Sequence, residues 1–249
     1  MLQIIPNPER GSDYMAYASK KAVLFEASEF VPDDLPSNAL RWYADSERVF
    51  SVSSKIYDLN PASDDPLIRE ISIRRYGELC RFALKTGARN IVFKSCCAPY
   101  LSGEHIEKWA FRFSAVINEL SEKYADTNLT FFIENALDAG PEPMAKVLEK
   151  VNPGKVKACL NVGAANCSGT PVGGWFDEIG EKIAYLRLSD NNGLFDENLP
   201  VGSGKVDWDM ISRMSAYLPE DLPITIVSYG LTDTKRSIEY LRHRRYFGL

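Results

Sequence analysis

Hydrophobic and polar positions alternate along this chain in a rhythm typical of repeated strand–helix units. Short runs rich in β-branched and aromatic residues, such as "NIVFKSC" and "LTFFIEN", are each followed by a longer segment with apolar residues at helical spacing. Several of the short runs are almost continuously apolar, as a parallel sheet covered by helices requires. The pattern predicts eight strands, at residues 2–5, 22–30, 49–57, 90–96, 129–135, 156–163, 183–191 and 223–230.

Helices are predicted between and after these strands. The two longest cover residues 65–87 and 103–126, and the first closes with Gly87, a common helix-ending residue. The remaining helices are predicted at 12–21, 36–46, 141–151, 175–182, 207–218 and 232–244. Eight such units in 249 residues predict an α/β fold, a (β/α)8 TIM barrel, as a single domain over residues 1–249. A doubly wound open sheet is the alternative, because a strand count alone does not establish closure.

Composition restricts the class of protein. A hydrophobic content of 45% in 249 residues suits one sizeable core. No run of 18 apolar residues occurs, so no membrane span is expected, and the first residues lack the pattern of a secretory signal. We therefore expect a cytoplasmic protein. The 5 cysteines form no C-x-x-C pair and are odd in number, so we expect reduced thiols rather than a disulfide framework.

Charge argues against nucleic acid as a partner. The net charge is −5, acidic and basic residues are well mixed, and the one basic stretch, "LRHRRYFGL", is short. The chain has only 2 histidines, His105 and His243, and each falls in a charged helical segment away from other candidate ligands. A histidine-based metal site is therefore not expected. The sequence leaves the oligomeric state open.

Polar residues gather where the predicted strands end. In a TIM barrel the functional face lies at the C-terminal ends of the strands, so the residues just before each strand–helix loop are the candidates. The preceding halves of the same strands are apolar, and this contrast predicts a ligand pocket at the barrel mouth. The candidates are Ser53, Lys55, Lys94, Ser95, Glu134, Asn135, Asn161, Arg187, Asp190, Asn191 and Ser228.

Four segments carry a resemblance to a known family. They are "IYDLNPASDDPLIREIS", "FFIENALD", "CLNVGAAN" and "LRLSDNNGLFDENLPVGSGKVDW". Together they resemble the xylose isomerase-like TIM barrels, over residues 50 to 240 or so. That superfamily holds sugar and keto-acid isomerases, sugar epimerases and an apurinic endonuclease branch, and the resemblance implies both the barrel fold and carbohydrate chemistry.

The resemblance also implies a metal site that this chain does not reproduce. Family members hold a divalent cation with a Glu after strand five, an Asp after strand six, a His in strand seven and a Glu in strand eight. Only Glu134 matches that set. The other ligand positions, and three family histidine positions, carry different residues here: Asn161, Arg187, Ser228, Ala164, Ser53 and Lys94.

These departures all replace metal-binding groups by amides, hydroxyls and fixed cations. An arginine cannot lose its proton to become a ligand, and a divalent ion beside Arg187 and Lys94 would meet like-charge repulsion. We therefore expect no metal cofactor. We expect Arg187 to take the place of the ion's charge and to pair with Glu134. The pocket would then favour a small polar ligand that is either anionic or polyhydroxylated, and derived from carbohydrate.

The loop after the seventh strand supplies further candidates. In the resembled family an Asp-x-His in this loop contributes to the site, and here Asp196 matches the Asp while Asn198 replaces the His. Asp190 and Asn191 precede them in "SDNNG", which is also a strong turn signal by itself. The "GSG" of Gly202 and Gly204 fits either a phosphate-binding turn or a tight turn before a helix.

Two functions remain open at this point. The first is an isomerase or epimerase that moves a proton next to a carbonyl, with Glu134 as acid/base and with Arg187 and Lys94 stabilising the enediolate. Asn135, Asn161, Asp190, Asn191, Asp196, Asn198, Ser228 and Ser53 would bind the substrate. The second is a non-catalytic sugar- or anion-binding barrel. The discriminating feature is a second carboxylate, for which Glu26 of the second strand is the candidate. Nuclease activity is disfavoured by the acidic charge balance and the missing histidine cluster.

Overall fold

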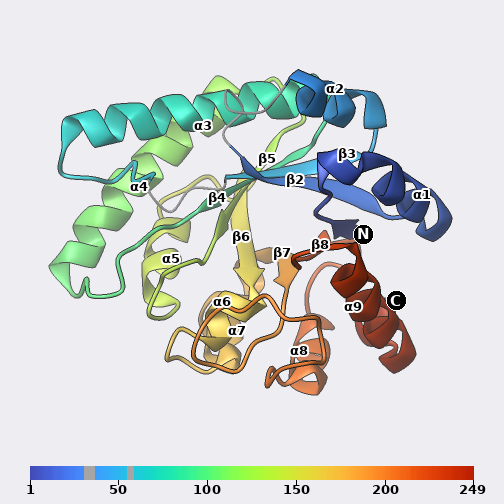
Figure 1. Cartoon of the computed structure of the whole chain (residues 1–249). Helices are drawn as coiled ribbons and strands as arrows, with labels where there is room; N and C mark the ends of the chain where they lie inside the picture. The colour runs from blue at the N-terminus through green and yellow to red at the C-terminus, as the bar shows by residue number, and fades with distance from the viewer. Residues whose placement is uncertain (31–36, 55–58) are drawn as a thin grey trace.

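Eight parallel strands close into a barrel in sequence order, β1 to β8, in this computed structural model (Figure 1). The structure describes residues 1–30, 37–54 and 59–249, so the candidate Lys55 lies outside the described residues. Closure rests on the pairing of the first strand with the last, in which Leu2 faces Ile224 and Ile4 faces Ile226. This pairing confirms the TIM barrel and rules out the open sheet. The strands are β1 Leu2–Ile4, β2 Leu24–Phe30, β3 Val49–Ser54, β4 Asn90–Lys94, β5 Thr130–Glu134, β6 Val156–Asn161, β7 Ile183–Leu188 and β8 Ile224–Ile226.

Helices follow the strands and cover the outside of the barrel, with α3 and α4 as the longest (Figure 1). The ends of α3 show why the sequence folds this way. The side chain of Asp65 accepts hydrogen bonds from the first backbone N–H groups of the helix, and Gly87 closes it at a φ of +74°. The helices are α1 Gly11–Lys21, α2 Ser37–Ser46, α3 Pro66–Thr86, α4 Glu104–Lys123, α5 Glu142–Leu148, α6 Val162–Asn166, α7 Val172–Ile179, α8 Trp208–Ser215 and α9 Leu231–Arg244.

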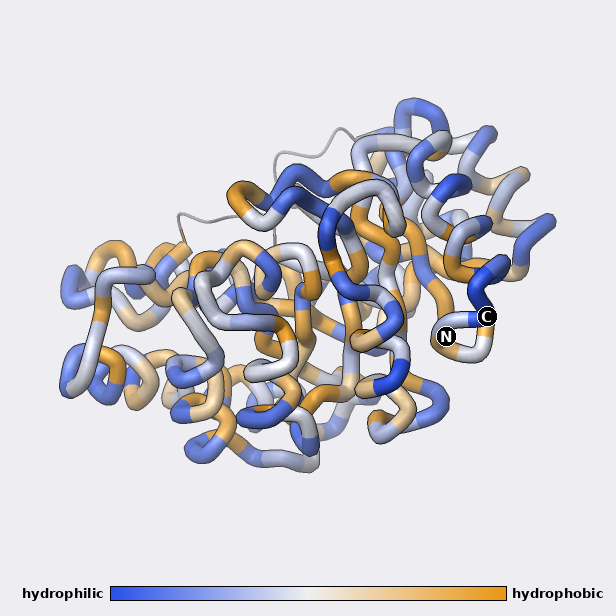
Figure 2. The backbone as a smooth tube through the Cα atoms, turned by 90° about the horizontal axis from the view of Figure 1, so that it is seen from below, coloured by the Kyte–Doolittle hydropathy of each residue, from blue (hydrophilic) through white to orange (hydrophobic). Residues whose placement is uncertain are grey.

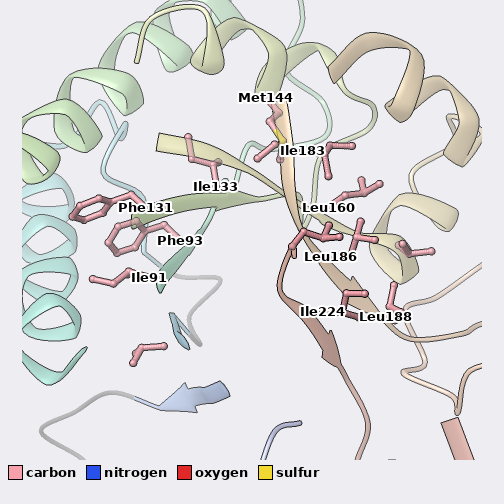
Figure 3. Close-up of a cluster of buried hydrophobic side chains, with 14 of the residues drawn as sticks. Ile91, Phe93, Phe131, Ile133, Met144, Leu160, Ile183, Leu186, Leu188 and Ile224 are labelled. Atoms are coloured by element: carbon pink, nitrogen blue, oxygen red, sulfur yellow. The ribbon is translucent and has the colours of Figure 1, made fainter. Parts of the chain in front are cut away.

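The hydrophobic core lies between the strands and the helices. Residues on the outer face of the strands, such as Phe93, Phe131 and Ile133, are fully buried and belong to one large apolar cluster (Figure 3). The rings of Phe93 and Phe131 stack with centroids 6.1 Å apart. Burial of such side chains contributes about 1.5–3 kcal/mol each, so this shell is the main source of stability.

The strand ends differ from the sequence prediction at one informative place. The sequence predicts a strand over residues 156–163, but β6 ends at Asn161 and the short helix α6 begins directly after it. The Asn161 side-chain oxygen accepts a hydrogen bond from the Ala164 backbone N–H at 3.1 Å, which caps the helix. Asn161 therefore ends a strand and starts a helix at the barrel mouth.

The two chain termini lie side by side in both views of the backbone (Figures 1 and 2). The Met1 amino group donates to the Leu222 carbonyl oxygen at 2.9 Å, just before β8. The structure describes all five cysteines and none of them forms a disulfide, in agreement with that prediction. Within the described ranges, none of the helices is long and apolar enough to cross a membrane.

Candidate functional site

The inner face of the barrel carries polar side chains from every strand, together with a small apolar cluster in which Val92, Phe132 and Cys159 pack with Tyr185. The inward side chains alternate with the outward apolar ones, as the two-residue period of a strand dictates. Most of the polar ones are joined by hydrogen bonds across the barrel, and all are buried. We call this set the inner network: Gln3, Glu26, Ser28, Ser51, Ser53, Asn90, Lys94, Glu134, Asn161, Tyr185, Arg187 and Thr225.

Arg187 lies at the centre of the inner network, between two carboxylates. Its Nη1 donates to Glu134 Oε2 at 2.6 Å, and its Nη2 is 3.2 Å from Glu26 Oε1. The side chain of Arg187 is 1% exposed and those of both glutamates are 0% exposed. The predicted pairing of Arg187 with Glu134 is therefore present, but the guanidinium divides its two ends between two partners from β2 and β5.

Hydroxyl groups hold the Glu26 carboxylate in place. Its Oε1 accepts from Ser53 Oγ at 2.8 Å, and its Oε2 accepts from Tyr185 Oη at 2.6 Å. Tyr185 in turn contacts Thr225 Oγ1 at 2.7 Å and accepts from Gln3 Nε2 at 3.1 Å. Each Glu26 oxygen therefore has a defined donor, which fixes the orientation of this carboxylate.

Amides and a second cation surround Glu134. Asn161 Nδ2 donates to Glu134 Oε1 at 2.9 Å, and Asn135 holds Asn161 by bonding both its backbone N–H and its carbonyl. Burial raises the pKa of the Glu134 carboxyl, but the positive charges of Arg187 and Lys94 outweigh it, so the pKa lies below the usual value. The two glutamates raise the pKa of Arg187 in turn. Glu134 and Arg187 therefore both carry their charges at neutral pH.

A divalent metal does not fit this donor set. The positions closest to the two carboxylates are filled by a guanidinium, which bonds to both of them and has no lone pair to offer. Among the described residues, no group of three or more His, Cys, Asp or Glu side chains could hold a metal ion. The absence of a metal cofactor stays a prediction, and the position of Arg187 between the two carboxylates supports it.

Asp190 and Asn191 shape the loop after β7 instead of contacting the Glu134–Arg187 pair. The Asp190 carboxylate accepts from three backbone N–H groups and from the Trp208 indole N–H at 2.8 Å. One of these donors is the Gly202 N–H at 2.9 Å, so the "GSG" segment serves as a tight turn. Asn191 bonds the Gly163 carbonyl oxygen at 2.8 Å and accepts from Asn166. Both side chains thus anchor the loop.

Asp196 approaches the inner network from the same loop. Its Oδ1 and the Ser189 Oγ are both buried, and the Ser189 hydroxyl interacts with the Asp196 carboxyl, which lowers the pKa of that carboxyl. A Cβ at Gly163 would lie 2.2 Å from Ser189 Oγ and 2.8 Å from Asp196 Oδ1, so glycine makes room for both. Burial and the charge of Glu134 outweigh the Ser189 contact and raise the pKa of Asp196. Asp196 and Ser189 therefore form a polar pair beside the mouth.

Ser228 and Asn198 lie on the wall of a pocket of about 390 Å³ at the barrel mouth. Ser228 Oγ contacts Thr234 Oγ1 at 2.7 Å, which fixes the turn into α9. Asn198 adopts a left-handed φ of +49°, and its Nδ2 donates to the Asp196 carbonyl oxygen. Ser28 of β2 also lines this pocket. The structure thus brings these two predicted residues to one cavity, on the Glu26 side of Arg187.

Three residues of the site were not among the predicted site residues, or were named only as a possible second carboxylate: Glu26, Ser28 and Tyr185. The two-residue period of the strands could have identified them. Glu26 and Ser28 share one face of "LFEASEF", and Tyr185 shares a face with Arg187 in "IAYLRL". A charged residue in the middle of an apolar strand indicates an inner-facing position, because the outer face is covered by helices.

Comparison with known proteins agrees with the fold and with the sequence resemblance. The family model described as xylose isomerase-like TIM barrel matches residues 19–216. An uncharacterized protein of Methanocaldococcus jannaschii, MJ1311, is 22% identical over 199 residues, which is 77% of this chain and 68% of that protein.

Solved structures share the whole architecture at low identity. A D-tagatose 3-epimerase-like protein superposes with a TM-score of 0.80 at 19% identity, over 98% of this chain and 96% of that one. The IOLI protein, solved with a binding zinc atom, gives a TM-score of 0.79 at 14% identity, over 100% of both chains. The similarity at these identities establishes the fold, and that zinc belongs to the IOLI protein.

Proposed function

We propose, from the premise that this chain belongs to the xylose isomerase-like TIM barrel family, that it is a metal-independent sugar isomerase or epimerase. One observation carries the proposal: Glu26 and Glu134, from different strands, contact the two ends of one guanidinium. Proton transfer next to a carbonyl needs a carboxylate base and a cation for the developing oxyanion. The inner network holds both within hydrogen-bonding distance of each other.

The proposed chemistry begins with an exchange of partners at Arg187. A carbonyl oxygen of the substrate takes over a guanidinium N–H, which releases Glu134 as the base. Glu134 removes the proton next to the carbonyl, and Arg187 and Lys94 stabilise the enediolate. Delivery of that proton by Glu134 to the former carbonyl carbon, with a proton moving between the two enediol oxygens, gives aldose–ketose isomerisation. Epimerisation instead requires Glu26, after taking up a proton from solvent, to protonate the opposite face of the original carbon while Glu134 releases its proton to solvent. Either outcome is an isomerisation with no net change in atoms or electrons.

Other side chains have supporting roles in this proposal. Asn135, Asn161 and Ser53 orient the two carboxylates through the bonds described above. The Arg187 Nε–H is buried and has no hydrogen-bond partner within the described ranges, so it can donate a hydrogen bond to a substrate oxygen. The D-tagatose 3-epimerase-like relative supports carbohydrate as the substrate class.

One observation favours a second candidate, a non-catalytic sugar-binding barrel. Glu26 and Glu134 are fully buried, and every one of their four oxygens has a donor. A carboxylate held this firmly is a weak base until its donors are displaced. If ligand binding leaves the Arg187 pairs intact, the barrel binds its ligand without reaction.

Solvent exchange distinguishes the two candidates. The chelator-treated protein is incubated in deuterated water with a panel of ketoses and aldoses, and deuterium next to the carbonyl is followed by NMR. We expect exchange that Glu134→Gln lowers at least about 100-fold, the usual scale for loss of a general base. Glu107→Gln is the matched control, because Glu107 is a half-exposed carboxylate paired with Lys146 on the surface. Sugar binding without exchange in the unmodified protein would establish the second candidate.

A further inference from the structure

A second pocket lies at the opposite end of the barrel from the candidate site. Its volume is about 450 Å³, and it is formed by the loops that lead into β4, β5 and β6. Its lining includes two cations, Arg89 and Lys155, and three polar side chains, Thr127, Asn128 and Thr130. The two stretches outside the described residues follow the C-terminal ends of β2 and β3, which are parallel to β4 and β5. Those stretches therefore leave this end of the barrel fully described.

Neither cation of this pocket has an acidic partner. Arg89 is exposed, and its guanidinium forms no ion pair or hydrogen bond within the described ranges. Lys155 forms no ion pair in the same part of the chain, and its Nζ donates to the carbonyl oxygens of Ala125 at 3.0 Å and Thr127 at 3.4 Å. Two carbonyl groups thus hold the ammonium in place without cancelling its charge. An ammonium has three N–H donors, so one remains for a ligand.

Backbone hydrogen bonds place the two cations on either side of the start of β5. The Thr130 N–H donates to the Arg89 carbonyl oxygen at 2.8 Å, and the Phe131 N–H donates to the Lys155 carbonyl oxygen at 2.9 Å. The Gly154 N–H donates to Asn152 Oδ1 at 2.9 Å, which braces the turn that carries Lys155. Because the backbone of the pocket is already held, ligand binding has little ordering to do beyond the Arg89 side chain.

The charge of this pocket selects the class of ligand. Its described lining carries two positive charges and no negative one. Asp126, next to Thr127 in the α4–β5 loop, is exposed, lies outside the lining and forms no ion pair with a described residue. A phosphate monoester carries about −1.5 to −2 charges at pH 7, which matches two cations better than the single charge of a carboxylate. Arginine also binds phosphate through two parallel N–H groups, and lysine binds it as a point charge.

From these features we infer that Arg89 and Lys155 form a binding site for a doubly charged phosphate group, present as inorganic phosphate or as a small phosphate monoester. The site lies at the start of β5, whereas Glu134 ends that strand, so it is separate from the candidate active site. It therefore holds whether or not the proposed function does. Thr127, Asn128 and Thr130 supply further hydrogen-bonding groups for the phosphate oxygens.

Direct binding of inorganic phosphate tests this inference. The protein is titrated by calorimetry with phosphate, with glycerol phosphate as a monoester and with acetate as a singly charged anion, all at one ionic strength maintained with chloride. We expect saturable binding of at least one of the two phosphates, and at least about tenfold weaker binding of acetate, which forms fewer charge-assisted hydrogen bonds. The phosphate that binds should also raise the melting temperature, because it binds the folded state.

The comparison of the two phosphates identifies the source of the group. Tighter binding of the monoester indicates an organic phosphate, and tighter binding of inorganic phosphate indicates the free ion. No saturable binding of either one, or acetate binding as tight as theirs, would overturn the inference.

Variants on the same end of the barrel locate the bound anion. Arg89→Gln should weaken phosphate binding about tenfold, the scale of one charge-assisted contact, and should leave the phosphate-free melting temperature unchanged because Arg89 has no partner to lose. Lys182→Gln is the matched control, since Lys182 is exposed before β7 and does not line the pocket. Asp126→Asn should tighten binding about twofold by removing a repulsive charge. Unchanged phosphate affinity in Arg89→Gln would place the anion elsewhere and refute the inference.

Discussion

The two faces of the barrel strands differ in composition: the outer face is apolar, whereas the inner face is mostly polar, with Val92, Phe132 and Cys159 as its small apolar part. In β5, Phe131 and Ile133 point outward into the apolar shell (Figure 3). Glu134 of the same strand points inward and pairs with Arg187. The same alternation occurs in β7, where Leu186 and Leu188 pack outward and Arg187 lies inside. The interiors of most TIM barrels are filled by branched apolar side chains, so this inner face departs from the usual packing.

The comparison indicates how stability and function are divided. The outer face supplies the free energy of folding through apolar burial. The inner face contains buried charges, and a buried ion pair contributes little net stability compared with apolar side chains of similar volume. A chain that keeps such a network inside its barrel gains something other than stability from it, which supports a functional interpretation of Glu26, Glu134 and Arg187.

Removal of the central cation should produce the largest effect. Arg187→Met leaves two buried carboxylates without their partner, and we expect the free energy of unfolding to fall by about 3–5 kcal/mol. Urea unfolding followed by circular dichroism measures this. Combining Arg187→Met with Glu26→Gln should restore part of the loss, because the remaining charges of Glu134 and Lys94 then balance. If the Arg187→Met variant were as stable as the unmodified protein, the burial of the two carboxylates would not depend on Arg187.

A second, smaller effect concerns a buried carboxyl that lacks a cation. Asp138, in the loop after β5, is 4% exposed and accepts from Ser95 Oγ and the Ala136 N–H, and burial raises its pKa to about 6. Its folded pKa therefore exceeds the unfolded value, so the folded state binds the proton more tightly. Stability should fall as pH rises from about 4 to about 6, by at most about 3 kcal/mol.

Asp138→Asn provides the comparison for this pH effect, because an amide does not titrate. Unfolding curves at several pH values should show a smaller loss of stability across this window in the variant. Glu134 should behave in the opposite way, because its pKa is lower in the folded state than in the unfolded state. The stability that it contributes is fully present above the unfolded pKa and is lost as pH falls through the folded pKa. An unchanged pH profile in Asp138→Asn would mean that another group titrates there.

The smallest predicted effect tests the outer face. Ile133→Val removes one methylene from the apolar shell, and we expect a loss of about 1 kcal/mol in unfolding free energy. The substitution leaves the inner network intact, so the affinity for free sugars should not change. Denaturant unfolding and calorimetry on the same preparation check both statements. A change in sugar affinity would show that the outer face also affects ligand binding.

Much of the fold could be predicted from the sequence because the strand and helix periods are strong. All eight strands lie where the alternation placed them, and the helices from α1 to α9 were expected apart from α6. That helix has five residues and depends on the Asn161 cap, too short a segment for periodicity to show.

The candidate site was only partly predictable. The pairing of Arg187 with Glu134 followed from charge and from the resemblance. The position of Glu26 depends on barrel closure and register, which bring Glu26 of β2 to Arg187 of β7 although the two strands lie near opposite ends of the chain. Asp190 and Asn191 anchor their loop through contacts with distant backbone groups. Sequence spacing does not reveal such contacts, and the substrate-binding role of these two residues stays a prediction.

The central claim is that Arg187 supplies the positive charge between Glu26 and Glu134 without a metal ion. Zinc titration by calorimetry, on the unmodified protein and on Arg187→His, tests it most directly. We predict no zinc binding in the unmodified protein that depends on Glu134. In Arg187→His, we predict one zinc per chain, held by the introduced imidazole together with Glu26 and Glu134 and abolished by Glu134→Gln. Stoichiometric zinc in the unmodified protein that Glu134→Gln removes would contradict the claim.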